Sequence, residues 1–261
     1  MLRLACLALT AAIGFHATDV RATAFGTNPL PAPEAPGGDT PAGSCGPVLL
    51  TQTTSQTAVP GTIACLAGVL HAENSYYREY GLSALPNGLD VCAVELAIES
   101  SNAGDPATSQ PLTINLYSQT GGAFPGGTRT PIGTATVQVP DGGLRGFSVP
   151  VTGSVPAGQS LVVEALLPNG QPAGHSMFLG SNAAGQSGPS FLRAPACGAA
   201  APATLAALGF PNVHMILNAR GSVPAGLPPA VPVPGPGGLA LLIGALALVG
   251  AGVFQLRRRM T

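Results

Sequence analysis

Lysine and tryptophan are absent from the sequence, and charged residues of either sign make up only 8% of it. Aromatic residues are also scarce, at 5%. Between residues 25 and 256, five arginines stand against ten acidic residues, which gives a net charge of −5. Proteins that bind nucleic acid need a basic patch or stripe. We therefore expect no nucleic-acid partner.

Complete catalytic and metal-binding motifs are missing as well. The sequence has no Gly-x-Ser-x-Gly nucleophile elbow and no His-Glu-x-x-His zinc motif. His-Ala-Glu at 71–73 matches half of a zinc-deaminase signature, but no Pro-Cys-x-x-Cys accompanies it. Asp90, Asp105 and Asp141 lie at turns without an Asp-x-Asp spacing, which leaves calcium binding as an alternative only. We expect no enzymatic activity, no cofactor and no metal.

Paired carboxylates are the remaining route to catalysis. A glycosidase needs two facing carboxyl groups, one of them with a raised pKa. Glu95, Glu99 and Glu164 are the carboxylates in strand-like segments. Glu95 and Glu99 share the face opposite an apolar row, which predicts exposure to solvent. An envelope hydrolase is therefore the least favoured hypothesis.

A long uncharged segment closes the sequence. Residues 237–256 contain no charge, and a helix of this length would be about 30 Å long, enough to cross a bilayer. Three arginines follow, within a predicted basic tip at 257–261. Positive charge stays on the cytoplasmic side, so we expect everything before residue 237 to lie outside the cytoplasm.

The N-terminal segment agrees with export. Arg3 precedes an apolar run at 4–13, and Ala-Thr-Ala at 22–24 offers a cleavage site. We predict a signal peptide at 1–24. Together with the C-terminal helix, it gives one membrane span and an exported domain.

Glycine and proline make up 63 of 261 residues and concentrate near both ends of the exported part. We predict a Pro- and Gly-rich linker at 25–44 and a Pro-rich linker at 222–236. The residues between them, 45–221, are enough for one domain with a sizeable core.

The C-terminal layout resembles the bacterial PEP-CTERM sorting signals and the related IPTL-CTERM class. A proline-rich motif, a membrane helix and an arginine cluster follow one another. The usual Val-Pro-Glu-Pro core reads Val-Pro-Val-Pro here, and a Gly-Gly pair also resembles the GlyGly-CTERM class. The resemblance implies processing by an exosortase-like membrane enzyme. The residues that carry it are Val231, Pro232, Val233, Pro234, Gly237, Gly238, Arg257, Arg258 and Arg259.

Apolar residues in the central domain recur with a period of two, which predicts strands. Turn signals such as Pro-Asp-Gly-Gly at 140–143 separate the segments. We therefore predict an all-β antiparallel sandwich, with a jelly roll as one arrangement; the segments at 74–82 and 178–192 resemble a bacterial extracellular sandwich domain. The expected inward rows are Cys92, Val94, Leu96 and Ile98; Leu112, Ile114 and Leu116; Ala135, Val137 and Val139; and Phe147, Val149 and Val151.

Four cysteines remain once Cys6 leaves with the signal peptide. An even number in an exported chain predicts two disulfides, with three pairings open. We favour Cys45–Cys65, which would hold the N-terminal arm, and Cys92–Cys197, which would tie a core strand to a late loop. Buried free thiols are the alternative.

Tyr76, Tyr77 and Tyr80 form the only aromatic cluster. In a strand, Tyr76 and Tyr80 share one face and Tyr77 takes the other. They are candidate contacts for an extracellular polysaccharide, although cross-strand packing explains them more simply. We expect an exported, C-terminally sorted surface or matrix protein without enzymatic activity; a carbohydrate- or calcium-binding module is the alternative.

Overall fold

The computed structural model describes residues 22–28 and 45–225. The proline-rich sorting motif, the predicted membrane helix at 237–256 and the arginines that follow it lie outside these residues, as does most of the predicted signal peptide. Within the described residues, no helix has the length and apolar character needed to cross a membrane.

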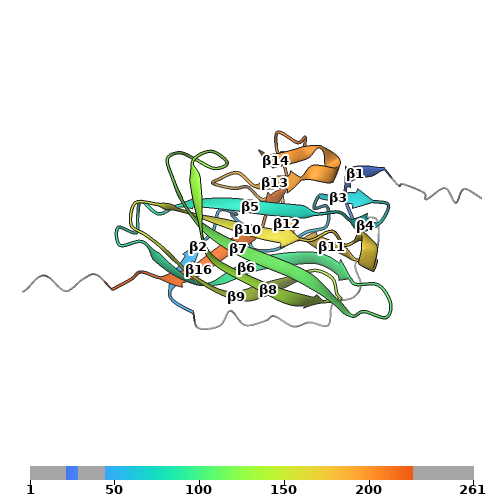
Figure 1. Ribbon diagram of the computed structural model, residues 1–261, viewed down its shortest axis with the longest axis horizontal. Coiled ribbons are helices and arrows are strands. Elements are labelled where there is room, and N and C mark those ends of the chain that lie inside the picture. Colours follow the sequence, from blue (N-terminus) through green and yellow to red (C-terminus); the bar gives the residue numbers. More distant parts are fainter. Residues whose placement is uncertain (1–21, 29–44, 226–261) are drawn as a thin grey trace, which may run out of the picture. The chain divides into compact units, whose positions relative to one another are not determined.

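Two antiparallel sheets form the body of the domain, and the predicted all-β sandwich is confirmed (Figure 1). The first has the strand order β14-β13-β5-β10-β7-β8, and the second has the order β11-β6-β16-β2, with β9 also paired to β6. The first comprises β14 (Ala199–Thr204), β13 (Phe191–Ala194), β5 (Asn74–Gly81), β10 (Ser160–Leu167), β7 (Ser109–Thr120) and β8 (Thr128–Pro140). The second comprises β11 (Ser176–Leu179), β6 (Leu89–Asn102), β16 (Leu217–Ser222), β2 (Val48–Leu50) and β9 (Arg145–Val155).

Two smaller sheets complete the described part. The strands β1 (Thr23–Gly26), β3 (Ala64–Ala67) and β4 (Leu70–His71) form one of them, and β12 (Ser181–Asn182) pairs with β15 (His214–Met215) in the other. Short 3₁₀ turns, η1 (Gln171–Ala173) and η2 (Pro195–Cys197), precede β11 and β14.

Strand β1 corrects the predicted boundaries near the N-terminus. Its four residues pair with β3, from Thr23 opposite Ala67 to Gly26 opposite Ala64. Phe25 and Gly26, the first residues of the predicted linker at 25–44, are therefore part of this strand.

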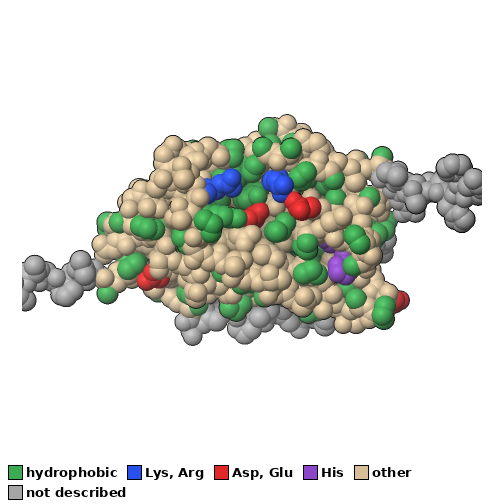
Figure 2. Space-filling model, viewed as in Figure 1, with side chains coloured by type: hydrophobic (Ala, Val, Ile, Leu, Met, Phe, Trp, Pro, Cys, Tyr) green, Lys and Arg blue, Asp and Glu red, His purple; other side chains and the backbone are tan. Residues whose placement is uncertain are grey.

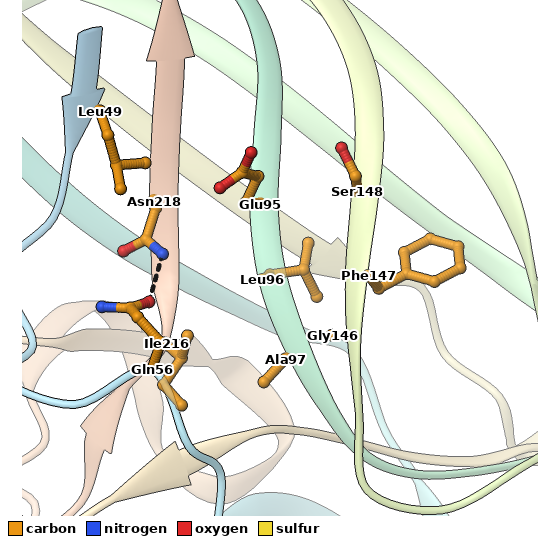
Figure 3. Close-up of a pocket in the computed structure, with 10 residues that line it drawn as sticks. All are labelled: Leu49, Gln56, Glu95, Leu96, Ala97, Gly146, Phe147, Ser148, Ile216 and Asn218. Atoms are coloured by element: carbon orange, nitrogen blue, oxygen red, sulfur yellow. Dashed lines mark hydrogen bonds between the residues drawn. The ribbon is translucent and has the colours of Figure 1, made fainter. Parts of the chain in front are cut away.

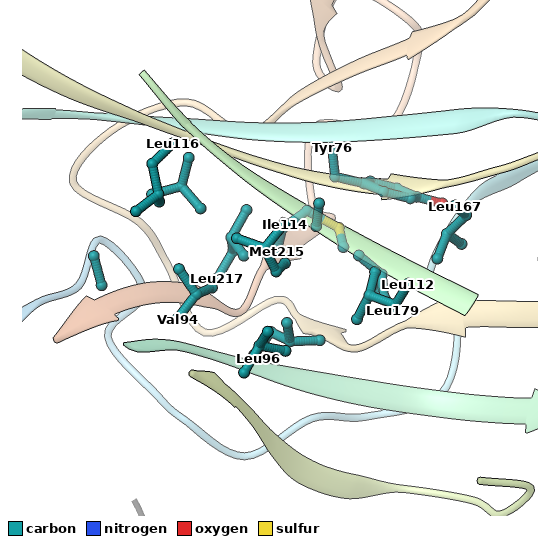
Figure 4. Packing of buried hydrophobic residues seen from close by; sticks show 14 of the residues in the cluster. Tyr76, Val94, Leu96, Leu112, Ile114, Leu116, Leu167, Leu179, Met215 and Leu217 are labelled. Atoms are coloured by element: carbon teal, nitrogen blue, oxygen red, sulfur yellow. The ribbon is translucent and has the colours of Figure 1, made fainter. Parts of the chain in front are cut away.

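The core lies between the two large sheets (Figure 4). Leu112, Ile114 and Leu116 of β7 are fully buried, and they belong to the same cluster as Val94 and Leu96 of β6. The alternation predicted for β7 is confirmed, and the rows predicted for β8 and β9 also belong to or pack against this cluster. Because the inward rows are buried, the alternate residues of the same strands are fixed on the outer faces of the sheets.

The alternation predicted for β6 fails at Cys92. The pairing of β6 with both neighbours shifts register around Val91 and Ala93, which is a β-bulge. Val91 and Val94 both enter the core, whereas Cys92 is half-buried. The extra residue reverses which side chains point inward, so Cys92 does not belong to the row that we predicted.

Both predicted disulfide pairings are wrong, although two disulfides are present. Cys45 is bonded to Cys92, and Cys65 is bonded to Cys197, with Cα–Cα distances of 5.7 and 5.8 Å. The bulge turns Cys92 away from the core, where Cys45 reaches it, whereas Cys65 is fully buried on β3 beside η2. Two disulfides indicate an oxidising environment, extracellular or periplasmic.

Candidate functional site

The outer face of the six-stranded sheet carries a row of aligned side chains. Phe191, Tyr77, Glu164, Asn115 and Thr134 lie directly opposite one another on β13, β5, β10, β7 and β8. Side chains that face each other across antiparallel strands are within contact distance. The strand register therefore gathers residues from five separate segments of the sequence.

Glu164 lies at the centre of this row and is only 6% exposed. The Tyr77 hydroxyl donates to its Oε1 at 2.7 Å, and the Tyr117 hydroxyl donates to Oε2 at 2.7 Å. The Asn115 amide donates to Oε2 at 2.9 Å, and Asn115 in turn accepts from the Thr134 hydroxyl at 2.7 Å. The carboxylate is thus fixed in place by three side-chain donors.

These donors decide the charge of Glu164. Burial alone would raise the pKa of its carboxyl group, but the bonds from Tyr77, Tyr117 and Asn115 together outweigh burial, so the pKa is lowered. The pKa values of the two tyrosines are raised, by burial first and by the neighbouring carboxylate as well. Glu164 therefore stays ionised as an acceptor, and the tyrosines stay protonated as donors.

A groove of about 700 Å³ opens over this network. Figure 2 shows basic and acidic side chains gathered together on one face of the molecule, which otherwise carries few charges. Glu164 is the one carboxylate among the residues that line the groove. The lining residues are Tyr77, Tyr117, Gly127, Thr128, Arg129, Glu164, Arg193, Ala200, Ala201 and Pro202.

Arg129 stands at one side of the groove, on β8. Its guanidinium carbon lies 5.0 Å from the ring centre of Phe124 and 5.8 Å from that of Tyr117. Phe124 is itself held in an aromatic cluster, 5.0 Å from Tyr77 and 4.8 Å from Phe191 between ring centres. Cation–π contacts of this kind restrain the arginine without consuming its hydrogen-bond donors.

Arg193 stands on β13 and also lines the groove. Its Nη1 donates to Glu73 Oε1 at 2.6 Å, in a pair that is partly exposed. Glu73 is therefore paired with Arg193 and not with His71, the other residue of the half zinc motif at 71–73. The His71 Nδ1 accepts from the Met177 amide at 3.1 Å, and burial lowers the His71 pKa to about 4.

The three clustered tyrosines divide between the faces as predicted. Tyr76 and Tyr80 point into the core, at 0% and 4% exposed, and donate to the carbonyls of Ile63 and Leu217. They offer no ring to a glycan, so this part of the prediction is wrong. Tyr77 points to the opposite face of β5. It is 4% exposed, and it is the one tyrosine of the three that lines the groove.

Glu99 was predicted to be exposed to solvent but is buried, because the loop before β3 covers it. It is 2% exposed, and its Oε2 accepts from the backbone amides of Thr62 at 2.8 Å and Gly61 at 3.1 Å. Burial raises the pKa of Glu99, and the two amides only partly offset that effect.

A smaller pocket, of about 200 Å³, lies on the second sheet (Figure 3). Figure 3 shows Gln56 bonded to Asn218 at its edge, and Glu95 on the neighbouring strand. The Glu95 carboxylate is already paired with Arg220. This pocket has less polar chemistry to offer than the groove.

Asp90, Asp105 and Asp141 were predicted to lie at turns, but Asp90 is on β6, and in the described residues the three are not grouped around a common point. Asp90 accepts from the Ser154 hydroxyl at 2.6 Å, and Asp141 accepts from the Ala103 amide at 2.7 Å. In the residues that the structure describes, no three acidic, histidine or cysteine side chains are grouped closely enough to hold a metal ion.

Sequence reasoning missed the groove, although it had named Glu164 as a strand carboxylate. The available signal was that Glu164 is the only charge in the otherwise apolar run 161–167. The sequence does not show that Tyr117 and Arg129 meet near it, since these residues come from different strands.

The groove and its bonded carboxylate were described from this structure, without help from related proteins. No known protein family matches the chain, and comparisons with curated proteins and with solved structures found no match either.

Proposed function

We propose that this chain is an exported, C-terminally sorted protein of the cell surface or extracellular matrix, without enzymatic activity, whose folded domain binds a glycan in the groove over Glu164. The preformed carboxylate network is the observation that carries the binding role. Sugars present many hydroxyl groups, which can both donate to a fixed carboxylate and accept from arginine and tyrosine.

The charge of Glu164 favours binding over hydrolysis. A general acid in a glycosidase needs a raised pKa and a second carboxylate across the scissile bond. Glu164 has a lowered pKa, and no second carboxylate lines the groove. Calcium binding has no comparable support in the described residues.

A glycan array tests the binding role. The wild-type protein should bind a limited set of glycans, and Tyr117→Phe should weaken that binding about tenfold, because the carboxylate loses one of its positioning donors. Glu95→Gln, on the other sheet, is the matched control and should leave binding unchanged. No binding by wild type, or equal loss in the control, would overturn the proposal.

The sorting role rests on the resemblance of the C-terminal segment. We propose that an exosortase-like enzyme recognises the motif at 231–234 and removes the helix at 237–256. Intact mass of the protein recovered from its own host tests this step. A mass that includes the whole segment through Thr261 would leave a permanent membrane anchor instead. Deleting 257–259 tests orientation, since those charges set it.

A further inference from the structure

Arg129 differs from every other arginine among the described residues. Its guanidinium lies over the rings of Phe124 and Tyr117 and makes no hydrogen bond or ion pair with the described residues. The other four, Arg78, Arg145, Arg193 and Arg220, each donate hydrogen bonds to oxygen atoms of the protein. Arg129 is therefore the one whose donors have no oxygen partner within this part of the chain.

The Arg129 side chain is exposed, but the two rings beneath it are themselves held in place. Phe124 is 4% exposed and packs edge-on against Phe191, and the Tyr117 hydroxyl is bonded to Glu164. The segment that carries Phe124 is fixed in turn, because the Phe124 amide donates to Glu79 Oε2 at 2.9 Å. A guanidinium stacked on fixed rings is oriented before a ligand arrives, and its N–H edge remains free to bind two oxygens at once.

Two charges in the groove have no ion-pair partner among the described residues, the carboxylate of Glu164 and the guanidinium of Arg129. Three neutral donors stabilise the Glu164 carboxylate without cancelling its charge, whereas Arg193 is paired with Glu73. Among the residues that the structure describes, no acidic side chain is paired with Arg129. Tyr117 separates the two regions of the groove, since its hydroxyl contacts Glu164 while its ring lies near Arg129.

We infer that the groove takes an acidic glycan, a polymer of uronic acid residues, with a sugar carboxylate bound by Arg129 and sugar hydroxyls bound near Glu164. This inference rests on the proposed glycan-binding function and adds the chemical class of the ligand. A uronic acid carries one carboxylate and several hydroxyls on the same ring, which matches one cationic and one anionic region in the same groove.

Titration calorimetry on the full chain in detergent micelles tests the inference. The probes are oligogalacturonate, oligomannuronate and oligoglucuronate, each compared with its own methyl ester, which has the same hydroxyls and no charge. For at least one pair, the acid should bind about tenfold more tightly than the ester at low salt. The preference should shrink as ionic strength rises.

Arg129→Gln should abolish the preference of the acid over the ester while leaving the binding of the ester unchanged. Arg145→Gln, which removes an arginine from the other sheet, is the matched control and should keep the preference. A thermal melt of each variant checks that the fold is retained.

The outcomes separate this inference from the proposed function. Glycan binding that depends on Tyr117 but shows no preference for any acid would overturn the inference and keep the function. A preference that survives Arg129→Gln would also overturn it. If neither the acids, the esters nor the array glycans bind, both proposals fall.

Discussion

Glu164 and Glu99 are two buried carboxylates on the outer faces of opposite sheets, and their pKa values move in opposite directions. Burial removes both carboxyl groups from solvent, and this by itself raises the pKa of each. Glu164 receives three side-chain hydrogen bonds, whereas Glu99 receives two from backbone amides. The comparison teaches that the donors around a buried carboxylate decide the direction in which its pKa moves.

The largest expected effect is that of Glu164→Gln on stability. The change removes a charge that three donors stabilise and places an NH₂ group where at least one tyrosine hydroxyl must turn from donor to acceptor. We expect a loss of about 3 kcal/mol in the free energy of unfolding at pH 7. Urea denaturation measures it; a loss below about 1 kcal/mol would show that the network is weakly coupled.

The pH dependence should have opposite signs at the two sites. The lowered pKa of Glu164 contributes stability that is present above the ordinary value of 4.5 and is lost as pH falls through its folded pKa. The raised pKa of Glu99 contributes stability that is present below 4.5 and is lost as pH rises through its folded pKa. Urea denaturation between pH 3 and 7 should show that Glu164→Gln loses less free energy of unfolding toward acid pH than the wild-type protein does.

In the same series, Glu99→Gln should remove a loss of stability that occurs as pH rises. The same slope for both variants would contradict the opposite assignments of the two carboxylates.

Tyr117→Phe should have a smaller effect than replacing the carboxylate. It removes one of three donors while the other two remain, so we expect a loss of about 1 kcal/mol. It should also raise the pKa of Glu164, measurable by NMR titration of the carboxyl carbon. Tyr80→Phe removes a hydroxyl from the core and serves as a control, because it should leave that pKa unchanged.

Glu99→Gln should have the smallest effect at neutral pH. Its remaining amide oxygen can still accept from Thr62 and Gly61, and no charge is left to desolvate. We expect a change within about 1 kcal/mol. A large destabilisation would show that the two backbone donors outweigh the burial of Glu99, contrary to its raised pKa.

The sequence allowed the sandwich to be predicted, because alternation along a single strand is a local signal. In β7, Leu112 and Asn115 take the faces that their positions indicated. The local signal fails where one extra residue is inserted, and the bulge beside Cys92 overturned both the inward row and the disulfide pairing.

The candidate site was beyond local reasoning for a different physical reason. Tyr77, Asn115 and Glu164 come together only through the register of three strands that are distant in the sequence. Alternation places each side chain on the outer face, but it does not say which residues will lie opposite one another. The charge state of Glu164 depends on that pairing.

Strand β1 also bears on where the proposed signal peptide would be cleaved. Removing a leader after Ala24 would delete half of a strand that pairs with β3, and with it the hydroxyl of Thr23 that donates to the Ala196 carbonyl at 2.6 Å. A cut two residues earlier, after Ala22, retains a small residue at the cleavage point and leaves the strand whole. We therefore expect the N-terminal peptide of the mature protein to begin at Thr23 by mass spectrometry; a mature chain that begins at Phe25 would show that the fold tolerates a shortened first strand.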